Sequence, residues 1–137
     1  KMMKLSKMTD YAVILLAEMA MKDGQLISAS HLAMKTNLPE PTVSKLLKML
    51  ARQNIIQSVR GANGGYQLVQ KPENITIAHV VNATDGPVML TACADQDNDC
   101  CERTQECSMR GKWSPLNQAM NHALESISLS QMIGGHN

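Results

Sequence analysis

The sequence contains very few aromatic residues: no phenylalanine, two tyrosines and one tryptophan among 137 residues. Proteins that bind single-stranded nucleic acids stack the bases on aromatic side chains, so this mode of binding is disfavoured. Long apolar runs are also missing. The longest, residues 11–21, contains Glu18 and is too short to span a membrane, and no signal-peptide pattern precedes it. We therefore expect a cytoplasmic protein without membrane contact.

Motifs of the common enzyme classes are absent as well. The sequence shows no serine, histidine and acid grouping and no pair of carboxylates suited to acid–base catalysis. Gly64 and Gly65 lack the Lys-Ser/Thr pair that follows the glycines of a phosphate-binding loop. The four histidines lie far apart, and we assign them no function: His31, His79, His122 and His136. The protein is not expected to be an enzyme.

Charge is distributed unevenly along the chain. Residues 1–71 hold ten lysines and arginines against four acidic residues, whereas the remainder holds three against eight, giving net charges of +6 and −5. A positive surface neutralises the phosphates of DNA, and a negative surface is repelled by them. Any face that binds nucleic acid is therefore expected in the first part of the chain.

Two helices are predicted near the N-terminus. Residues 11–21 are apolar on nearly all sides, which predicts a buried helix that ends at Gly24. A short second helix is expected from a capping serine, Ser28 or Ser30, to about Asn37. Its length suits the first half of a helix-turn-helix.

A third helix is expected to have one apolar and one polar face. It begins between Pro39 and Pro41, where proline costs no helical hydrogen bond and its fixed φ favours the first turn. Apolar residues then recur with helical spacing at Val43, Leu46, Leu47 and Leu50. The opposite face carries Thr42, Ser44, Lys45, Lys48 and Arg52. One face can pack while the other meets DNA.

Two strands, residues 55–60 and 66–69, are predicted after this helix. The loop between them, residues 61–65, contains glycines that can adopt the positive φ values of a tight turn. Three helices followed by a hairpin predict a fold that is mainly α with a small β-hairpin wing, the winged helix-turn-helix. Arg60 lies at the base of this wing, where it can reach a phosphate or the minor groove.

Duplex DNA is the partner that this arrangement favours, although the same charges could simply solvate a helix face. Small and polar side chains at the leading end of a helix can approach base edges, while basic residues bind phosphates. The candidate DNA-binding residues are Ser28, Pro39, Pro41, Thr42, Ser44, Lys45, Lys48, Arg52 and Arg60.

The C-terminal part is expected to contain a helix over residues 75–85, a loop over 92–111 and a long final helix. After Trp113, apolar residues recur at spacings of three and four at Leu116, Ala119, Met120, Ala123, Leu124 and Ile127. Such a narrow seam needs a partner helix, and a twofold homodimer is the simplest source. The expected division is 1–86, a DNA-binding domain; 87–112, a cysteine-rich sensory loop; and 113–137, a dimerisation helix and tail.

All four cysteines lie close together, at Cys93, Cys100, Cys101 and Cys107. Disulfides among them would close only small loops, and a reducing cytosol would oppose them, so metal or redox chemistry is indicated. Zinc accepts four cysteines, but Cys-x-x-Cys pairs are missing. A metal-free thiol switch remains an alternative to a bound metal.

A calcium loop is a further interpretation of this stretch. Asp95, Asp97, Asp99 and Glu106 match four positions of such a loop, but Cys100 stands where the sharp turn needs glycine. Calcium is therefore disfavoured.

The segment from Ser58 to Tyr66, SVRGANGGY, resembles the wing of the Rrf2 family of winged-helix transcription regulators. The opening string from Lys4 to Ala12, the tripeptide Thr84-Asp85-Gly86 and the late cysteines follow in the family's order, so the resemblance covers nearly the whole chain. It implies a DNA-binding regulator. Within the family, the sequence looks similar to regulators of the SUF iron-sulfur assembly genes.

The resemblance also implies an iron-sulfur cluster bound by thiolates. Cys101 and Cys107 match the short cysteine spacing of cluster-binding members, and Cys93 lies farther away. The implied ligands are therefore Cys93, Cys101 and Cys107, with Cys100 as an alternative to Cys101 or as a fourth ligand.

The fourth ligand separates two branches of the family. In IscR-like members a histidine shortly after the last cysteine completes a 2Fe-2S cluster, but this sequence has Arg110 there. In NsrR-like members an aspartate of the partner subunit completes a 4Fe-4S cluster, and the resemblance places Asp10 at that position. Asp10 could equally be a helix-start carboxylate favoured by the helix dipole.

The function expected from the sequence is a transcription regulator whose cluster state biases the geometry of its two reading helices. One alternative is a repressor that senses thiol oxidation or nitric oxide without a metal. Another, from a different class, is an iron-sulfur carrier with an incidental winged helix. Steep salt dependence of operator binding would distinguish a regulator from a carrier.

Overall fold

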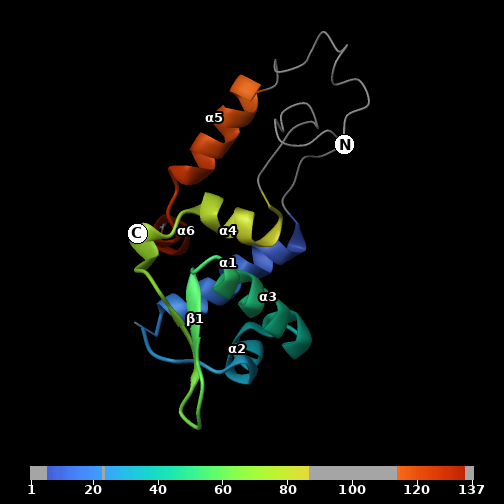
Figure 1. The fold of residues 1–137 in the computed structure, drawn as a ribbon, viewed down its shortest axis with the longest axis vertical. Coiled ribbons are helices and arrows are strands. Elements are labelled where there is room, and N and C mark those ends of the chain that lie inside the picture. The colour runs from blue at the N-terminus through green and yellow to red at the C-terminus, as the bar shows by residue number, and fades with distance from the viewer. Residues whose placement is uncertain (1–5, 23, 87–113, 135–137) are drawn as a thin grey trace.

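The computed structural model describes residues 6–22, 24–86 and 114–134. Figure 1 shows α1 to α4 packed together, the hairpin wing beside α2 with its loop extending beyond it, and α5 extending away from this group. The described residues contain no helix long and apolar enough to cross a membrane. The elements in chain order are α1 (Lys7–Ala20), α2 (Ala29–Thr36), α3 (Glu40–Arg52), β1 (Ile56–Val59), β2 (Gly65–Leu68), the 3-10 helix η1 (Pro72–Asn74), α4 (Ile77–Thr84), α5 (Ser114–Glu125) and α6 (Leu129–Gly134).

Helix α1 begins earlier than its apolar pattern predicts, because Ser6 caps it. The Ser6 hydroxyl accepts a hydrogen bond from the Thr9 amide at 3.3 Å, which satisfies one of the free N–H groups of the first turn. The helix is also less buried than expected. Leu15 and Leu16 are fully buried, but Ile14 on the opposite side is 38% exposed.

Helices α2 and α3 form the predicted helix-turn-helix. Asn37 ends α2 in the left-handed conformation, with a φ of 63°, and so turns the chain toward α3. Pro39 precedes α3 as its N-cap. The four apolar residues predicted to face the core, Val43, Leu46, Leu47 and Leu50, are all fully buried.

The wing is an antiparallel pair in which Ile56 lies opposite Leu68 and Val59 opposite Gly65. It is fastened to the chain before α2, because Tyr66 and Ile27 exchange two backbone hydrogen bonds of 2.8 and 2.9 Å. Gly65 permits this contact, since a Cβ there would lie 2.7 Å from the Ile27 carbonyl oxygen.

The C-terminal part differs from the prediction in three ways. Helix α4 begins at Ile77 with Thr76 as its cap, two residues later than expected. Helix α5 ends at Glu125, so Ile127 does not continue its apolar seam. The short helix α6 was not predicted at all, although its Leu129 is fully buried in the same core as the leucines of α1 and α3.

The chain returns to the core between α5 and α6. There the Ile77 amide donates to the Ile127 carbonyl at 2.9 Å, and the Leu129 amide donates to the Ile75 carbonyl at 2.7 Å. Thr76 and Ser128 form an isolated β-bridge between these two bonds. The connection between α5 and α6 is therefore fixed to the residues that lead into α4.

Candidate nucleic-acid interface and the surroundings of Asp10

The polar face of α3 is the centre of the candidate interface. Lys45, Lys48 and Arg52 are exposed, while Thr42 and Ser44 are half-buried beside them. Pro41, in the first turn, is exposed too. Because every apolar residue of the repeat is buried on the other side, this face is available to a partner.

Two further predicted residues flank this face. Ser28 is the N-cap of α2, and its exposed hydroxyl accepts a 3.1 Å hydrogen bond from the His31 amide, so it has a local structural role in any case. Arg60 follows β1 directly and is exposed in the loop that closes the wing, so it lies at the tip of the hairpin and not at its base as predicted. Figure 1 shows the wing and α2 at the same end of the molecule.

Asp10 lies in the first turn of α1 and is exposed. Its backbone amide donates to the Ser6 carbonyl at 3.3 Å. The predicted ligands Cys93, Cys100, Cys101 and Cys107 fall outside the described residues. Within the part of the chain that the structure describes, no three histidines, cysteines or acidic residues gather closely enough to hold a metal.

Beside Asp10, a group of polar side chains that we call the polar clasp joins α1 to α4. It consists of Ser6, Thr9, Thr84 and Asp85. The Asp85 carboxylate accepts from the Ser6 hydroxyl at 2.5 Å, from the Ser6 amide at 3.2 Å and from the Thr9 hydroxyl at 2.8 Å. No local pattern in the sequence predicts this contact, and its only sign is the tripeptide Thr84-Asp85-Gly86.

The pKa of Asp85 results from two opposed effects. Partial burial is the largest single influence and raises the pKa, but the hydrogen bonds from Ser6 and Thr9 stabilise the charged form. These bonds together outweigh burial, so the pKa lies below its ordinary value of 3.8. Asp85 is therefore a carboxylate at neutral pH, and the clasp is charge-assisted.

A second contact joins α4 to the end of α3. His79 Nε2 lies 3.0 Å from the Gln53 carbonyl oxygen, just beyond Arg52. Because a carbonyl oxygen only accepts, this is a hydrogen bond when Nε2 carries the proton. Helix α4 thus contacts both the start of α1 and the end of the candidate reading helix.

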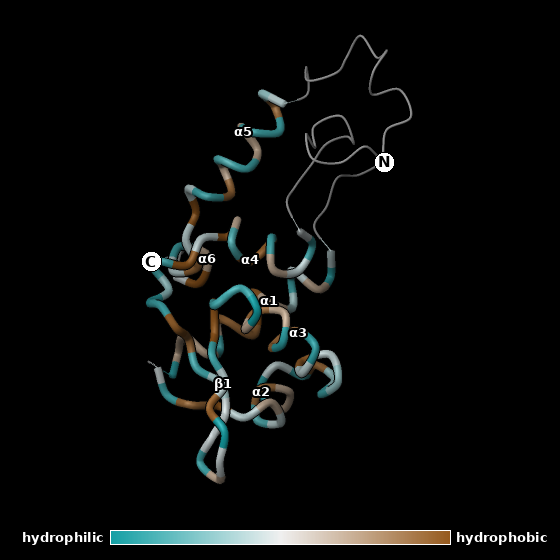
Figure 2. Tube along the Cα trace, viewed as in Figure 1, coloured by the Kyte–Doolittle hydropathy of each residue, from teal (hydrophilic) through white to brown (hydrophobic). Residues whose placement is uncertain are grey.

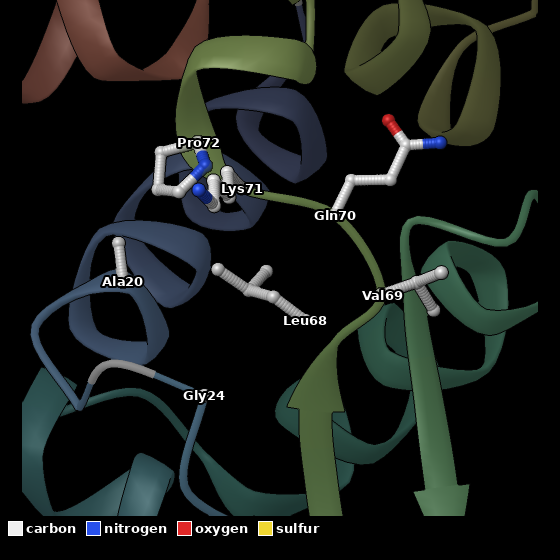
Figure 3. A pocket seen from close by; sticks show the side chains of 7 residues that line it. All are labelled: Ala20, Gly24, Leu68, Val69, Gln70, Lys71 and Pro72. Carbon is white, nitrogen blue, oxygen red and sulfur yellow. The ribbon is translucent and has the colours of Figure 1, made fainter.

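A small pocket lies at the opposite end of α1 (Figure 3). Its volume is about 200 Å³, and it is lined by Ala20, Gly24, Leu68, Val69, Gln70, Lys71 and Pro72. Ala20 is ten residues beyond Asp10, about 15 Å along a helix that rises 1.5 Å per residue. The pocket is therefore separate from the surroundings of Asp10 and from the polar clasp.

A helix-turn-helix followed by a two-stranded wing defines the class of winged-helix DNA-binding proteins. The chain belongs to the Rrf2 family, since the family model, described as an iron-dependent transcriptional regulator, matches residues 5–135. Among solved structures, CymR (YrzC), the global cysteine regulator of Bacillus subtilis, aligns with a TM-score of 0.69 and 26% identity over 97% of this chain and 98% of CymR. The predicted fold class is thus confirmed.

Two relatives support the same assignment. Protein rrf2 of Nitratidesulfovibrio vulgaris is 31% identical over 132 residues, which cover 96% of this chain and 87% of the relative. The transcriptional regulator NsrR of Halalkalibacterium halodurans is 27% identical over 132 residues, or 96% and 90% of the two chains. Because the family and its named members are transcription regulators, the expectation that the chain is not an enzyme is confirmed.

Proposed function

We propose that this Rrf2-family regulator acts in the cytoplasm as a homodimer that binds a pseudo-palindromic DNA operator, and that an iron-sulfur cluster controls its affinity. The observation that carries this proposal is the exposed basic face of α3 beside the wing, in a chain whose family model is described as iron-dependent. The division into a DNA-binding part (1–86), a sensory stretch (87–112) and a dimerisation part (113–137) belongs to the same proposal.

In this proposal α3 enters the major groove with its N-terminal end. Pro39, Pro41, Thr42 and Ser44 approach the base edges, because they are small enough for close contact. Lys45, Lys48 and Arg52 neutralise phosphates along the groove. Ser28, at the start of α2, binds the sugar-phosphate backbone of the DNA. Arg60 reaches a phosphate or the adjacent minor groove from the wing.

The dimer is proposed to form through α5. None of its residues is buried, and Leu116 is 52% exposed, so its apolar seam lacks a partner over much of its length. Figure 2 shows hydrophobic positions recurring along α5 between hydrophilic ones. A twofold-related α5 would cover these positions and place two copies of α3 on successive major grooves.

The donor set of the chain fits an iron-sulfur cluster. Thiolates from Cys93, Cys101 and Cys107, with Cys100 as an alternative, are the usual ligands, and the exposed carboxylate of Asp10 can complete a 4Fe-4S site in the partner subunit. Without Asp10, a 2Fe-2S cluster is the alternative. A bound cluster supplies a redox-active and oxidant-labile group. The target genes of the regulator are proposed to be those of iron-sulfur assembly.

A metal-free thiol switch is the second candidate. The structural likeness to CymR, named as a global cysteine regulator, favours it, and four closely spaced cysteines can oxidise without a metal. The two candidates differ in iron and acid-labile sulfide content.

The test is anaerobic purification, followed by absorption spectroscopy and iron and sulfide assays on wild type and Asp10→Ala. The control is Glu18→Ala, which removes a carboxylate farther along α1. We expect wild type and control to carry equal iron and sulfide, and Asp10→Ala to show less iron or an altered spectrum. Iron-free wild type that binds zinc stoichiometrically would contradict the cluster, and a protein without operator preference at low salt would contradict the regulator.

A further inference from the structure

We infer that Asp85 is a positioning residue that, through the polar clasp, holds the first turn of α1 against the end of α4 and couples Asp10 to the helix packed behind α3. This inference rests on the proposed function, because it concerns how a change near Asp10 reaches the DNA-binding face. The juxtaposition that carries it is the contact of residues 6–9 with residues 84–85, far apart in the sequence.

The first step leads from Asp85 to Asp10. Both the amide and the hydroxyl of Ser6 donate to the Asp85 carboxylate, so Ser6 cannot shift without breaking two charge-assisted bonds. The Ser6 carbonyl in turn accepts from the amide of Asp10, and its hydroxyl accepts from the amide of Thr9. Asp85 therefore fixes the turn from which the Asp10 side chain projects.

The second step concerns Thr9, which lies between the two helices. Among the described residues, Thr9 is the one polar residue that is buried, with 2% of its surface exposed. Its single hydroxyl proton goes to Asp85, so in the 2.5 Å contact with Thr84 the Thr84 hydroxyl is the donor, in place of its alternative bonds to the carbonyls of Val80 and Val81. A buried hydroxyl that loses such partners costs free energy, so the clasp resists partial opening.

Asp85 also lies at the point in the sequence where α4 ends and the cysteine stretch follows. Asp85 is the C-cap of α4, and Gly86, with a φ of 78°, follows it before the stretch that contains all four cysteines. One carboxylate thus joins the Asp10 turn to the residue at which the chain enters the cysteine stretch. A change in the cysteine stretch that displaces the end of α4 must also strain or release Ser6 and Thr9.

Helix α4 connects the clasp to the DNA-binding face. Helix α4 packs against both α1 and α3, and its His79 holds the carbonyl of Gln53 at the end of α3. Val80 and Val81 are buried between these hydrogen-bonded contacts, so this short helix is held in the core along its middle as well as at its ends. The clasp attaches the C-terminal end of α4 to the Asp10 turn. His79, near the N-terminal end of α4, attaches the helix to the end of α3.

The experiment compares operator affinity in the cluster-loaded and cluster-free states for four full-length variants. Asp85→Asn replaces an acceptor oxygen by a donor, and Thr9→Val removes the buried hydroxyl without changing charge. Thr9→Ser keeps the hydroxyl and is the conservative rescue. Glu73→Gln makes the same charge change as Asp85→Asn at an exposed residue of η1, outside the clasp.

We expect wild type, Thr9→Ser and Glu73→Gln to show similar ratios of the two affinities, in the range of about 5- to 150-fold typical of coupled sites. Asp85→Asn and Thr9→Val should bring the ratio close to one while keeping the cluster absorption spectrum. Amide hydrogen exchange gives a readout that needs no cluster: Thr9 and Asp10 should exchange faster in these two variants.

The results distinguish the role of the polar clasp from the proposed control of DNA binding by a cluster. A wild-type protein whose affinity ignores the cluster would overturn the proposed function. A full ratio and unchanged exchange in Asp85→Asn and Thr9→Val, with a coupled wild type, would overturn only the role of the clasp. A ratio lost equally in Glu73→Gln would show that charge, and not the clasp, is responsible, and would overturn it too.

Discussion

At the scale of single residues, the Asp85 carboxylate makes folding depend on acidity. Its pKa in the folded chain lies below the ordinary value of 3.8, so near that pH the unfolded chain binds more protons. Stability from this group is therefore fully present above about pH 4 and is lost as the pH falls through the lower, folded-state pKa.

We predict that the stability difference between wild type and Asp85→Asn shrinks as the pH is lowered from neutrality through this range. Urea unfolding followed by circular dichroism at several pH values measures it. Glu73→Gln, at an exposed residue of η1 outside the clasp, is the control for losing an acidic side chain without losing the hydrogen bonds of the clasp. A difference between wild type and Asp85→Asn that does not change with pH would contradict the assignment.

Gly64 illustrates a close approach that no other residue tolerates. A Cβ at this position would lie 2.1 Å from the Val59 carbonyl oxygen, so the loop must shift. We predict that Gly64→Ala destabilises the protein by about 1–3 kcal/mol and weakens operator binding through a displaced wing. Ala62→Ser, in the same loop and exposed, should have little effect on either denaturant midpoint or affinity. An alanine variant as stable as wild type would show that the wing adapts without cost.

At the scale of elements, the sequence predicted those parts whose signals are local. The two faces of α3 follow from the repeat of Val43, Leu46, Leu47 and Leu50, and the wing follows from glycines between two short strands. Helix α6 was missed because it has six residues and one buried anchor, Leu129, too few for a periodicity. Asp85 was missed because its partner Ser6 is 79 positions away, and no local pattern encodes such a contact.

The basic face of α3 leads to a prediction about salt. If Lys48 neutralises a phosphate, Lys48→Ala should weaken binding to specific and nonspecific DNA alike and reduce the slope of log affinity against log salt by about one. Fluorescence anisotropy across a salt series measures this slope. Lys71→Ala, an exposed lysine beyond the wing, is the matched control and should leave the slope unchanged. Equal slopes for wild type and Lys48→Ala would remove Lys48 from the proposed interface.

At the scale of the whole molecule, α5 is the proposed site of dimerisation. We predict that Leu116→Lys, which places a charge in the exposed seam, raises the dimer dissociation constant roughly a hundredfold, since burying an unpaired charge costs several kcal/mol. Analytical ultracentrifugation at several concentrations measures it. Met21→Lys, at a 73% exposed methionine next to α1, tests whether any added lysine has this effect. A Leu116→Lys protein that remains dimeric would place the interface elsewhere.

The pairing of Thr76 with Ser128 has a consequence for how the chain tolerates change in length. Asp85 is bonded to α1 at the end of α4, and Ile127 and Leu129 are bonded to Ile77 and Ile75, so two points far apart in the sequence are both attached to the core helices. In general, closing a loop between two fixed points costs only about 0.6 kcal/mol more each time the length of the loop doubles. We therefore expect that insertions or deletions among the cysteines cost little folding free energy, so that the spacing of the thiols can be adjusted for the proposed chemistry.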